Sequence, residues 1–315
     1  MNVFTRVGLM IFITLASLSA NAEPQAWLEK VTQHQWYSGA KKCGKPVIEP
    51  IEILKVNEST YILRQNKCQH FEAPFMYLLM GKYKALLLDT GAVDDASEFP
   101  LYETVRALVD DYAKQRNKTT YGLVVVHSHS HSDHRAADEQ FEGKPHVEVV
   151  APNAEAVANF FAFDEQGNSA LDLGKRMLSI VHIPGHQDES IAIYDPKTQW
   201  LLTGDTVYPG RLYVRDWQQF SKSIQRLVDF TRDKTVSAVM GTHIEMSATP
   251  GVDYPMGSQF QPQEHPLPLS PSILQEISDT LTTIGDKPQR KVLTSVIIYP
   301  VEPPSIWQRI AAWFM

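Results

Sequence analysis

Residues 127–134 place four histidines and an aspartate within eight positions, in the order His-Ser-His-Ser-His-Ser-Asp-His. They follow directly on residues 123–126, Leu-Val-Val-Val, an uninterrupted apolar run typical of a strand that is buried on both faces. Side chains two positions apart point the same way along an extended chain, so His129 and His131 can approach one metal ion together. Asp133 and His134 follow where the chain turns, and can face a second ion. Imidazole suits zinc, iron or nickel, and the added carboxylate keeps other divalent metals open. The run therefore favours a fold in which a buried strand ends at a metal site.

The remaining pattern indicates strands that alternate with helices, which predicts an α/β layer architecture. We expect short strands from about residue 47 to 89, among them 61–64, 75–80 and 85–89. Further strands are expected at 123–126, 147–150, 178–181, 191–194, 200–202, 236–240 and 292–299. We expect helices at 101–113, 154–161, 217–230 and 272–284, and a terminal helix from Ser305. Residues 248–272 are rich in Pro and Gly, which predicts a long loop. Loops of this length in a compact domain are often functional, and we expect this one to form one wall of the opening to the metal site.

Three further candidate ligands follow later predicted strands. His186 comes after Ile-Pro-Gly, Asp205 after Leu-Thr-Gly and His243 after Gly-Thr. Ligand sites in layered α/β folds collect beyond the strand ends, where loops converge. The sequence thus predicts that four strands deliver His or Asp side chains to one edge of the fold.

These motifs and their order resemble the metallo-β-lactamase superfamily from about residue 47 to 245. Its H-x-H-x-D-H motif is matched by His129, His131, Asp133 and His134. Its Pro-Gly-His, Gly-Asp and Gly-x-His motifs are matched by residues 184–186, 204–205 and 241–243.

The resemblance implies a four-layer αββα sandwich and two divalent metal ions, zinc first, with iron or manganese as options. It assigns His129, His131 and His186 to one ion, Asp133, His134 and His243 to the other, and Asp205 to a bridge between them. Two such ions lower the pKa of a shared water and supply hydroxide near neutral pH. The expected reaction is hydrolysis of an ester, lactone, thioester or amide carbonyl, with Asp133 also orienting the nucleophile.

The residue at the bridging position narrows the expected activity. Asp205 resembles the layout of glyoxalase II, lactonases and related esterases, whereas antibiotic-hydrolysing members of this layout carry Cys or Ser there. Two alternatives stay open. A mononuclear iron dioxygenase of the same superfamily would use His129, His131 and His186 with a carboxylate. A non-catalytic metal-binding protein would keep the ligands without turnover.

Several neighbouring side chains have two readings each. We expect His127 and Asp89 to position ligands rather than to bind metal, because a ligating imidazole usually needs an outer hydrogen-bond partner. His265 lies in the long loop, where it either lines the pocket or is an ordinary loop residue without a role in the site. Tyr208, Arg211 and Tyr213 follow Asp205 closely, and they either contact the substrate or else pack within the protein or face solvent. We expect packed or surface positions for His34, His70, His146 and His182.

The N-terminus predicts export. Arg6 precedes an apolar run over residues 7–16, and Ala20-Asn21-Ala22 matches a signal-peptidase site. The run is short for a bilayer span, although an uncleaved anchor is the alternative. Export to the periplasm or beyond favours a disulfide between Cys43 and Cys68, with two free thiols as the other reading. We expect no stable membrane insertion after cleavage.

The expected organisation is a signal peptide over 1–22, an N-terminal segment over 23–46 and a metallo-β-lactamase domain over 47–247. Residues 248–315 would complete the same domain with the long loop, a helix and a strand. The formal net charge of -7 disfavours a nucleic-acid partner, because phosphate binding requires a basic surface. A small-molecule substrate is therefore expected, and the oligomeric state stays open.

Overall fold

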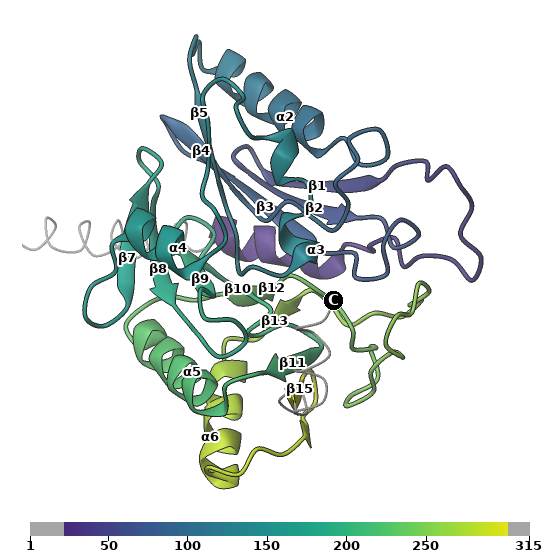
Figure 1. The fold of residues 1–315 in the computed structure, drawn as a ribbon, viewed down its shortest axis with the longest axis vertical. Helices are drawn as coiled ribbons and strands as arrows, with labels where there is room; N and C mark the ends of the chain where they lie inside the picture. The colour runs from purple at the N-terminus through teal and green to yellow at the C-terminus, as the bar shows by residue number, and fades with distance from the viewer. Residues whose placement is uncertain (1–21, 302–315) are drawn as a thin grey trace, which may run out of the picture.

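Two six-stranded sheets pack face to face in the computed structural model, which describes residues 22–301 (Figure 1). The first sheet has the order β1-β2-β3-β4-β5-β6 and the second has the order β13-β12-β10-β9-β8-β7. Their strands span β1 Ile51–Asn57, β2 Thr60–Gln65, β3 Phe75–Met80, β4 Lys84–Leu88, β5 Gly122–Val126, β6 Val147–Val149, β7 Asn168–Asp172, β8 Met177–His182, β9 Ile191–Asp195, β10 Trp200–Gly204, β12 Ala238–Gly241 and β13 Pro268–Leu269. A smaller sheet pairs β11 (Arg211–Val214) with β15 (Ile297–Pro300) and β15 with β14 (Lys291–Val292).

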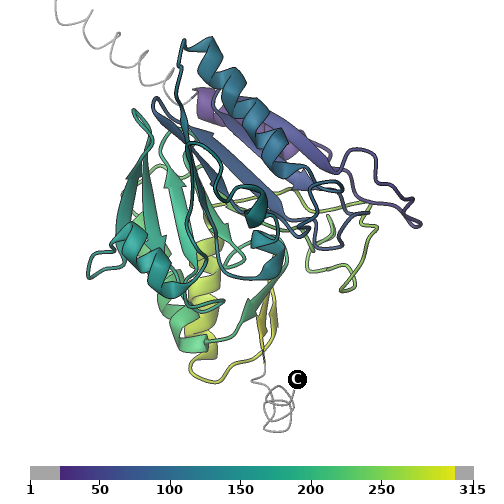
Figure 2. The same cartoon turned by 45° about the horizontal axis from the view of Figure 1, so that its top comes forward.

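Helices cover the two outer faces of the sandwich (Figure 2). The helix α2 (Leu101–Gln115) packs on the first sheet, and α5 (Trp217–Thr231) with α6 (Ile273–Ile284) packs on the second. Shorter helices follow β5, namely α3 (Ser132–Arg135), the 3₁₀ turn η1 (Asp138–Gln140) and α4 (Ala154–Phe161). This is the four-layer αββα arrangement that the resemblance implied.

Strand alternation divides the apolar side chains into three buried layers. On β4, Leu86 and Leu88 point into the central layer between the sheets, while Ala85 and Leu87 point to the layer under α2. Facing strands of the second sheet contribute Trp200 and Leu202 to the central layer. The continuous apolar character of residues 123–126 is therefore explained, because β5 is buried on both faces.

Parallel pairing at the centre of each sheet aligns the strand ends that matter for the site. The register places Leu88 of β4 opposite Val126 of β5 in the first sheet. In the second sheet Gly204 of β10 lies opposite Gly241 of β12. Both pairs end at the same edge of the sandwich, where the candidate ligands follow.

Several local predictions were wrong or incomplete. Residues 22–33 form a helix that was not predicted, and its Val31 packs on the central layer. The strands β7, β11 and β13 were not predicted either, and β13 lies within the predicted long loop. Residues 292–299 form two strands rather than one, because the chain turns between them and the Leu293 amide donates to the Val296 carbonyl. The signal peptide, apart from its last residue, and the predicted terminal helix lie outside the described residues.

The two cysteines, Cys43 and Cys68, form a disulfide, as the export prediction favoured. No helix among residues 22–301 is both long and apolar enough to cross a bilayer.

Candidate metal centre

The candidate ligands leave four strand ends and converge. His129 and His131 do not continue β5, which ends at Val126, so strand alternation is not what directs them as we had expected. His131 instead directly precedes α3, and Asp133 and His134 lie in that short helix. The grouping along the sequence was useful, but a turn rather than an extended strand produces it.

The first cluster combines three imidazoles with one carboxylate. His129 Nε2 lies 2.9 Å from His131 Nδ1, and His186 Nε2 lies 3.2 Å and 3.1 Å from these two atoms. The Asp205 Oδ2 atom lies 3.8 Å from both His129 Nε2 and His186 Nε2. All four side chains can therefore offer one atom each to a common point.

The second cluster lies directly beside the first. His243 Nε2 is 3.2 Å from His134 Nε2, and Asp133 Oδ2 is 3.2 Å and 3.3 Å from these two nitrogens. Asp205 faces this cluster too, since its Oδ2 lies 3.6 Å from His134 Nε2 and its Oδ1 lies 3.4 Å from His243 Nε2. One carboxylate thus lies between the two clusters.

Each imidazole is fixed from behind by a hydrogen-bond partner on its other ring nitrogen. Such outer partners set the orientation and tautomer of a ligating histidine. The five pairs are His129 Nδ1 with Ser128 Oγ, His131 Nε2 with the Gln187 carboxamide, His134 Nδ1 with Asp89, His186 Nδ1 with the Tyr213 carbonyl, and His243 Nδ1 with the Glu72 carbonyl.

The donor geometry fits divalent metal ions. Two nitrogen ligands at about 2.0–2.1 Å from one ion in a tetrahedral site lie about 3.3 Å apart. The nitrogen separations in both clusters, 2.9–3.2 Å, are close to that value. Each set of donors points inward with lone pairs facing one another, which is unfavourable unless a cation or a proton lies between them.

The charge states also suit metal binding. Burial lowers the pKa of His129 and of His186, and lowers that of His131 to about 4, so this cluster offers neutral imidazoles. In the second cluster burial is outweighed by carboxylates, which raise the pKa of His243 to about 9 and that of His134 well above its usual value. A metal ion there would take the place of the imidazole protons.

Close contact between the two sheets brings the clusters together. Gly204, directly before Asp205, has φ +53°, a conformation that favours glycine. A Cβ atom on Gly204 would lie 2.6 Å from the Ser128 Cβ atom, which belongs to the chain leaving the other sheet. The glycine of the Gly-Asp motif therefore allows the approach that places Asp205 between the two sets of histidines.

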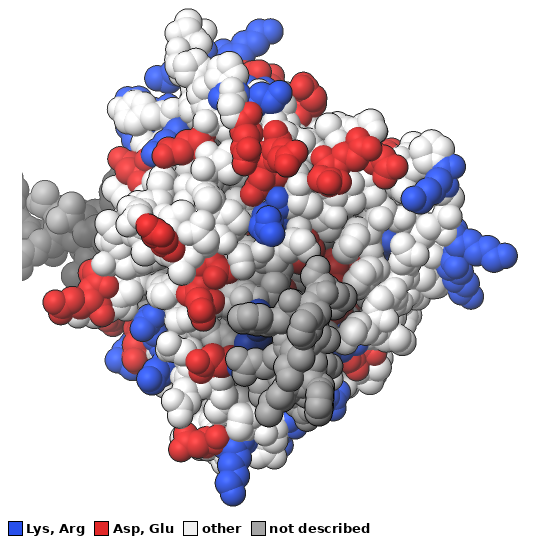
Figure 3. Space-filling view, viewed as in Figure 1, with Lys and Arg blue, Asp and Glu red and all other residues white. Residues whose placement is uncertain are grey.

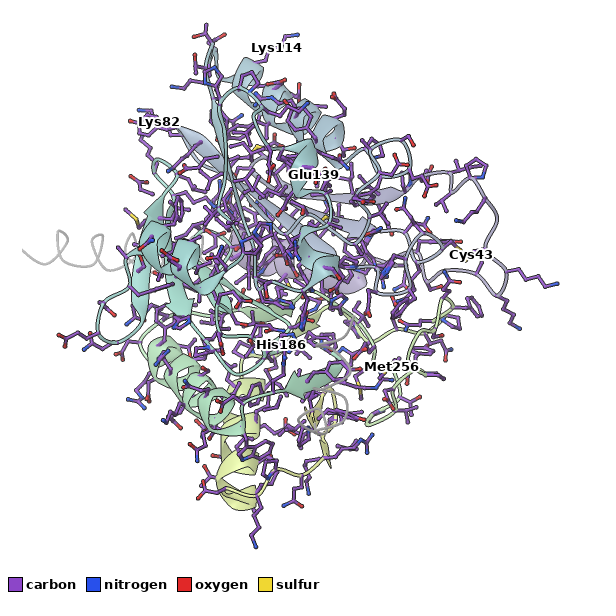
Figure 4. The ribbon with its side chains drawn as sticks, in the orientation of Figure 1. Cys43, Lys82, Lys114, Glu139, His186 and Met256 are labelled. Carbon is purple, nitrogen blue, oxygen red and sulfur yellow. A yellow bond between two sulfur atoms is a disulfide. The ribbon has the colours of Figure 1, made fainter. Side chains whose placement is uncertain are left out.

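A cavity of about 470 Å³ opens onto the clusters. The candidate ligands that line it are His131, Asp133, His186, Asp205 and His243. The long loop contributes residues 255–258 and Gln261, so this loop lines the site as we expected. In Figure 4, His186 is labelled near the middle of the molecule and Met256 to its right, whereas Lys82 and Lys114 are labelled in the upper part.

Other predicted side chains take varied places. His127 is buried and bonds Asp138 rather than joining a cluster, and Asp89 holds His134 from behind. His265 bonds Ser295 and is not among the residues that line the cavity.

Tyr208, Arg211 and Tyr213 do line the cavity. Tyr208 and Arg211 also bond Glu245, so both side chains are held within the protein.

Sequence reasoning missed Lys67, Glu72 and Gln261, which also line the cavity. None of them belongs to a spaced motif. Only the tertiary structure brings the turn after β2 and the long loop to the same opening.

The seven candidate ligands fall within, or at the end of, a known family pattern. The profile described as "Metallo-beta-lactamase superfamily" matches residues 72–243, which is more than half of the chain. The chain belongs to the metallo-beta-lactamase superfamily.

Relatives within this superfamily include hydrolases. The acyl-coenzyme A thioesterase MBLAC2 of Bos taurus is 26% identical over 207 residues, covering 53% of this chain and 72% of the relative. A hydroxyacylglutathione hydrolase of Legionella pneumophila (strain Lens) is 28% identical over 114 residues, covering 35% and 44%. The metallo-beta-lactamase FIM-1 of Pseudomonas aeruginosa shares the fold, with a TM-score of 0.50 at 14% identity, over 78% of this chain and all of that one.

Proposed function

We propose that this protein is an exported hydrolase that holds two divalent metal ions, with zinc as the first candidate, and cleaves thioester or ester bonds. The observation that carries the proposal is the position of Asp205, whose carboxylate faces His129 and His186 on one side and His134 and His243 on the other. A carboxylate shared by two adjoining ligand sets is suited to a pair of ions.

Each residue would have a defined role. His129, His131 and His186 would hold one ion, Asp133, His134 and His243 the other, and Asp205 would contact both. When bound, such ions lower the pKa of a coordinated water and polarise a substrate carbonyl.

Asp133 lines the cavity and is ionised, since the neighbouring His134 and His243 lower its pKa although burial opposes this. Its carboxylate can accept a hydrogen bond from the attacking water and orient it.

The names of the relatives support thioesters as the substrates of this protein. The relatives named as an acyl-coenzyme A thioesterase and a hydroxyacylglutathione hydrolase both act on acyl compounds. In the proposed reaction the oxygen of water bonds to the acyl carbon and the carbon–sulfur bond breaks. The leaving thiolate sulfur takes up the proton that the water gives up, so the products are a carboxylic acid and a thiol.

Export and a small-molecule substrate are part of the same proposal. The N-terminal sequence supports export, and the bond between Cys43 and Cys68 suits an oxidising compartment. The net charge is -7, and on the face in Figure 3 the Lys and Arg side chains form no continuous basic surface among the described residues. Both features disfavour nucleic acid as the substrate.

Metal analysis combined with a hydrolysis assay tests the proposal. The purified protein should contain close to two metal equivalents and hydrolyse an acyl thioester. His131→Ala should lose metal and activity together, whereas His265→Ala, a histidine of the long loop outside both clusters, should keep both. One equivalent of iron would favour the dioxygenase, and two ions without turnover of any ester, thioester or lactone would favour a non-catalytic protein. A fully active His131→Ala protein would refute the ligand assignment.

A further inference from the structure

A residue that lines the cavity carries a buried polar atom without a partner among residues 22–301. Gln261 is buried, with 4% of its surface exposed, and lines the cavity, yet its Oε1 atom makes no hydrogen bond there. The backbone of this residue is fixed, because its amide donates to the Ser38 carbonyl at 2.8 Å. A buried acceptor without a donor is costly, and a donor on a bound ligand would satisfy it.

A donor with spare capacity lines the same cavity. Lys67 is 1% exposed, and its Nζ atom donates to the Phe71 carbonyl at 3.1 Å. Its nearest carboxylate, Glu264, lies 3.8 Å away and already accepts two hydrogen bonds from Arg64, at 2.7 Å and 2.6 Å. An ammonium group has three donors, so Lys67 can bind a further acceptor.

The two side chains belong to one region, which we call the pocket wall and which comprises residues 38–39, 67–68 and 255–261. Within it, residues 67, 255–258 and 261 line the cavity, and the others support them. Gln259 Nε2 contacts the Lys67 carbonyl at 3.4 Å, and Gly39 forms a β-bridge with Phe260. A Cβ on Gly39, which has φ +82°, would lie 1.8 Å from the Gln259 carbonyl oxygen. The close approach at Gly39 therefore holds the loop against the turn that carries Lys67.

We infer that Lys67 and Gln261 form a subsite for an amide group of the substrate. The Lys67 ammonium would donate to the amide oxygen, and the amide N–H would donate to Gln261 Oε1, with the buried Gln261 carboxamide turning toward the cavity to meet it. A carboxylate carries acceptors only and would leave Gln261 without a partner, whereas a secondary amide offers an acceptor and a donor on separate atoms. The inference rests on the proposed function, because it defines which acyl compounds the hydrolase prefers.

The charge of Lys67 supports this assignment. Burial lowers the pKa of its ammonium to about 8, with the Arg64 charge adding to the effect, so the group stays mainly protonated at pH 7. Arg64 and Glu264 already balance each other at close range. Replacing Lys67 by Met therefore leaves a neutral buried pair, which makes this variant suitable for testing.

Matched substrates separate this subsite from general effects on catalysis. The butyryl thioester of N-acetylcysteamine carries an amide in its leaving group, and the butyryl thioester of pentanethiol has similar length without it. A second pair moves the amide to the acyl side, with thioesters of N-acetyl-β-alanine and hexanoic acid. In Lys67→Met and Gln261→Leu, kcat/KM for the amide member of at least one pair should fall about tenfold, while its partner is nearly unchanged.

Controls and a second readout keep the outcomes distinct. Lys82→Met removes an exposed lysine that does not line the cavity and should leave kcat/KM unchanged for all four substrates (Figure 4). Binding of N-acetyl-β-alanine and of hexanoate to the zinc-loaded protein is measured by calorimetry, which does not need turnover. If the wild type binds the amide compound more tightly and both variants lose that preference, the subsite stands even when no thioester is cleaved. Equal losses for both members of both pairs, or no preference in binding, would overturn it.

Discussion

The metal centre and the pocket wall meet at one cavity, but different forces hold them. In the centre, each imidazole follows a buried strand or lies in its adjoining turn, and a hydrogen bond fixes its outer nitrogen. The wall has almost no regular structure and depends on single β-bridges, one disulfide and the buried pair Arg64–Glu264. The comparison separates chemistry from selectivity, because the wall can vary while the centre stays in place.

Removing the carboxylate between the two clusters should have the largest effect on metal content and on activity. Asp205→Ala takes away a carboxylate that faces both ligand sets, so the protein should lose both metal equivalents rather than one. Thioesterase activity should fall at least about a hundredfold, because metal ions contribute several kcal/mol to such reactions. Elemental analysis and kinetics provide the measurement.

The control for that variant is Asp253→Ala. Asp253 pairs with Arg211, which lines the cavity and keeps Glu245 as a second partner. This protein should retain two ions. An Asp205→Ala protein with one tightly held ion and normal turnover would show that the two clusters are independent.

Disrupting the wall should reduce stability without removing metal. Glu264→Gln leaves the side chains of Arg64 and Lys67, both about 2% exposed, without their shared carboxylate. The free energy of unfolding should fall by about 3–5 kcal/mol, as for other buried pairs that lose one partner. Denaturant unfolding measures this, and the folded fraction should still hold two ions.

An exposed pair gives the matched comparison. Glu58→Gln removes the partner of Lys55, and both side chains are about half exposed or more. Its effect on the free energy of unfolding should be much smaller than that of Glu264→Gln, because solvent screens an exposed ion pair. Loss of metal from folded Glu264→Gln protein would mean that wall and centre are energetically coupled.

The smallest expected effect concerns selectivity alone. Met256 lines the cavity and is 67% exposed, so Met256→Ala should leave stability and metal content unchanged. The ratio of kcat/KM between a long and a short acyl thioester should shift about three- to tenfold, because each buried CH₂ group contributes about 0.8 kcal/mol. Met177→Ala, at a 50% exposed methionine that does not line the cavity, should leave the ratio unchanged. A change in melting temperature with a constant ratio would make the loop a structural tether.

The sequence predicted the centre better than the wall for a physical reason. The ligands follow apolar strands within short motifs, and the glycine before Asp205 permits the close contact with Ser128, so local spacing carries the information. The family and the four-layer fold follow from the same motifs and are confirmed. The reason given for pairing His129 with His131 was wrong, since β5 ends before them.

The wall lacked such a signal. Lys67 and Gln261 are separated by almost two hundred positions and have ordinary neighbours, so only tertiary packing reveals their shared cavity. The loop as a whole could be predicted to line the site because it begins close to His243. Its inner contacts could not, and His265, the residue that stood out by type, bonds Ser295 instead.

The disulfide between Cys43 and Cys68 has a consequence for how the protein matures. It joins positions 25 residues apart. In the chain-entropy account, closing a loop of that size lowers the entropy of the unfolded chain and raises the free energy of unfolding by about 3–4 kcal/mol. One end of this cross-link is the neighbour of Lys67, whereas all seven candidate metal ligands lie outside the loop that it closes. A newly made chain with reduced thiols already contains its complete ligand set, but the segment before β1 is not yet fastened to the rim of the cavity. Under the proposed export, oxidation after synthesis would thus fasten this segment to the rim of the cavity without involving the metal ligands.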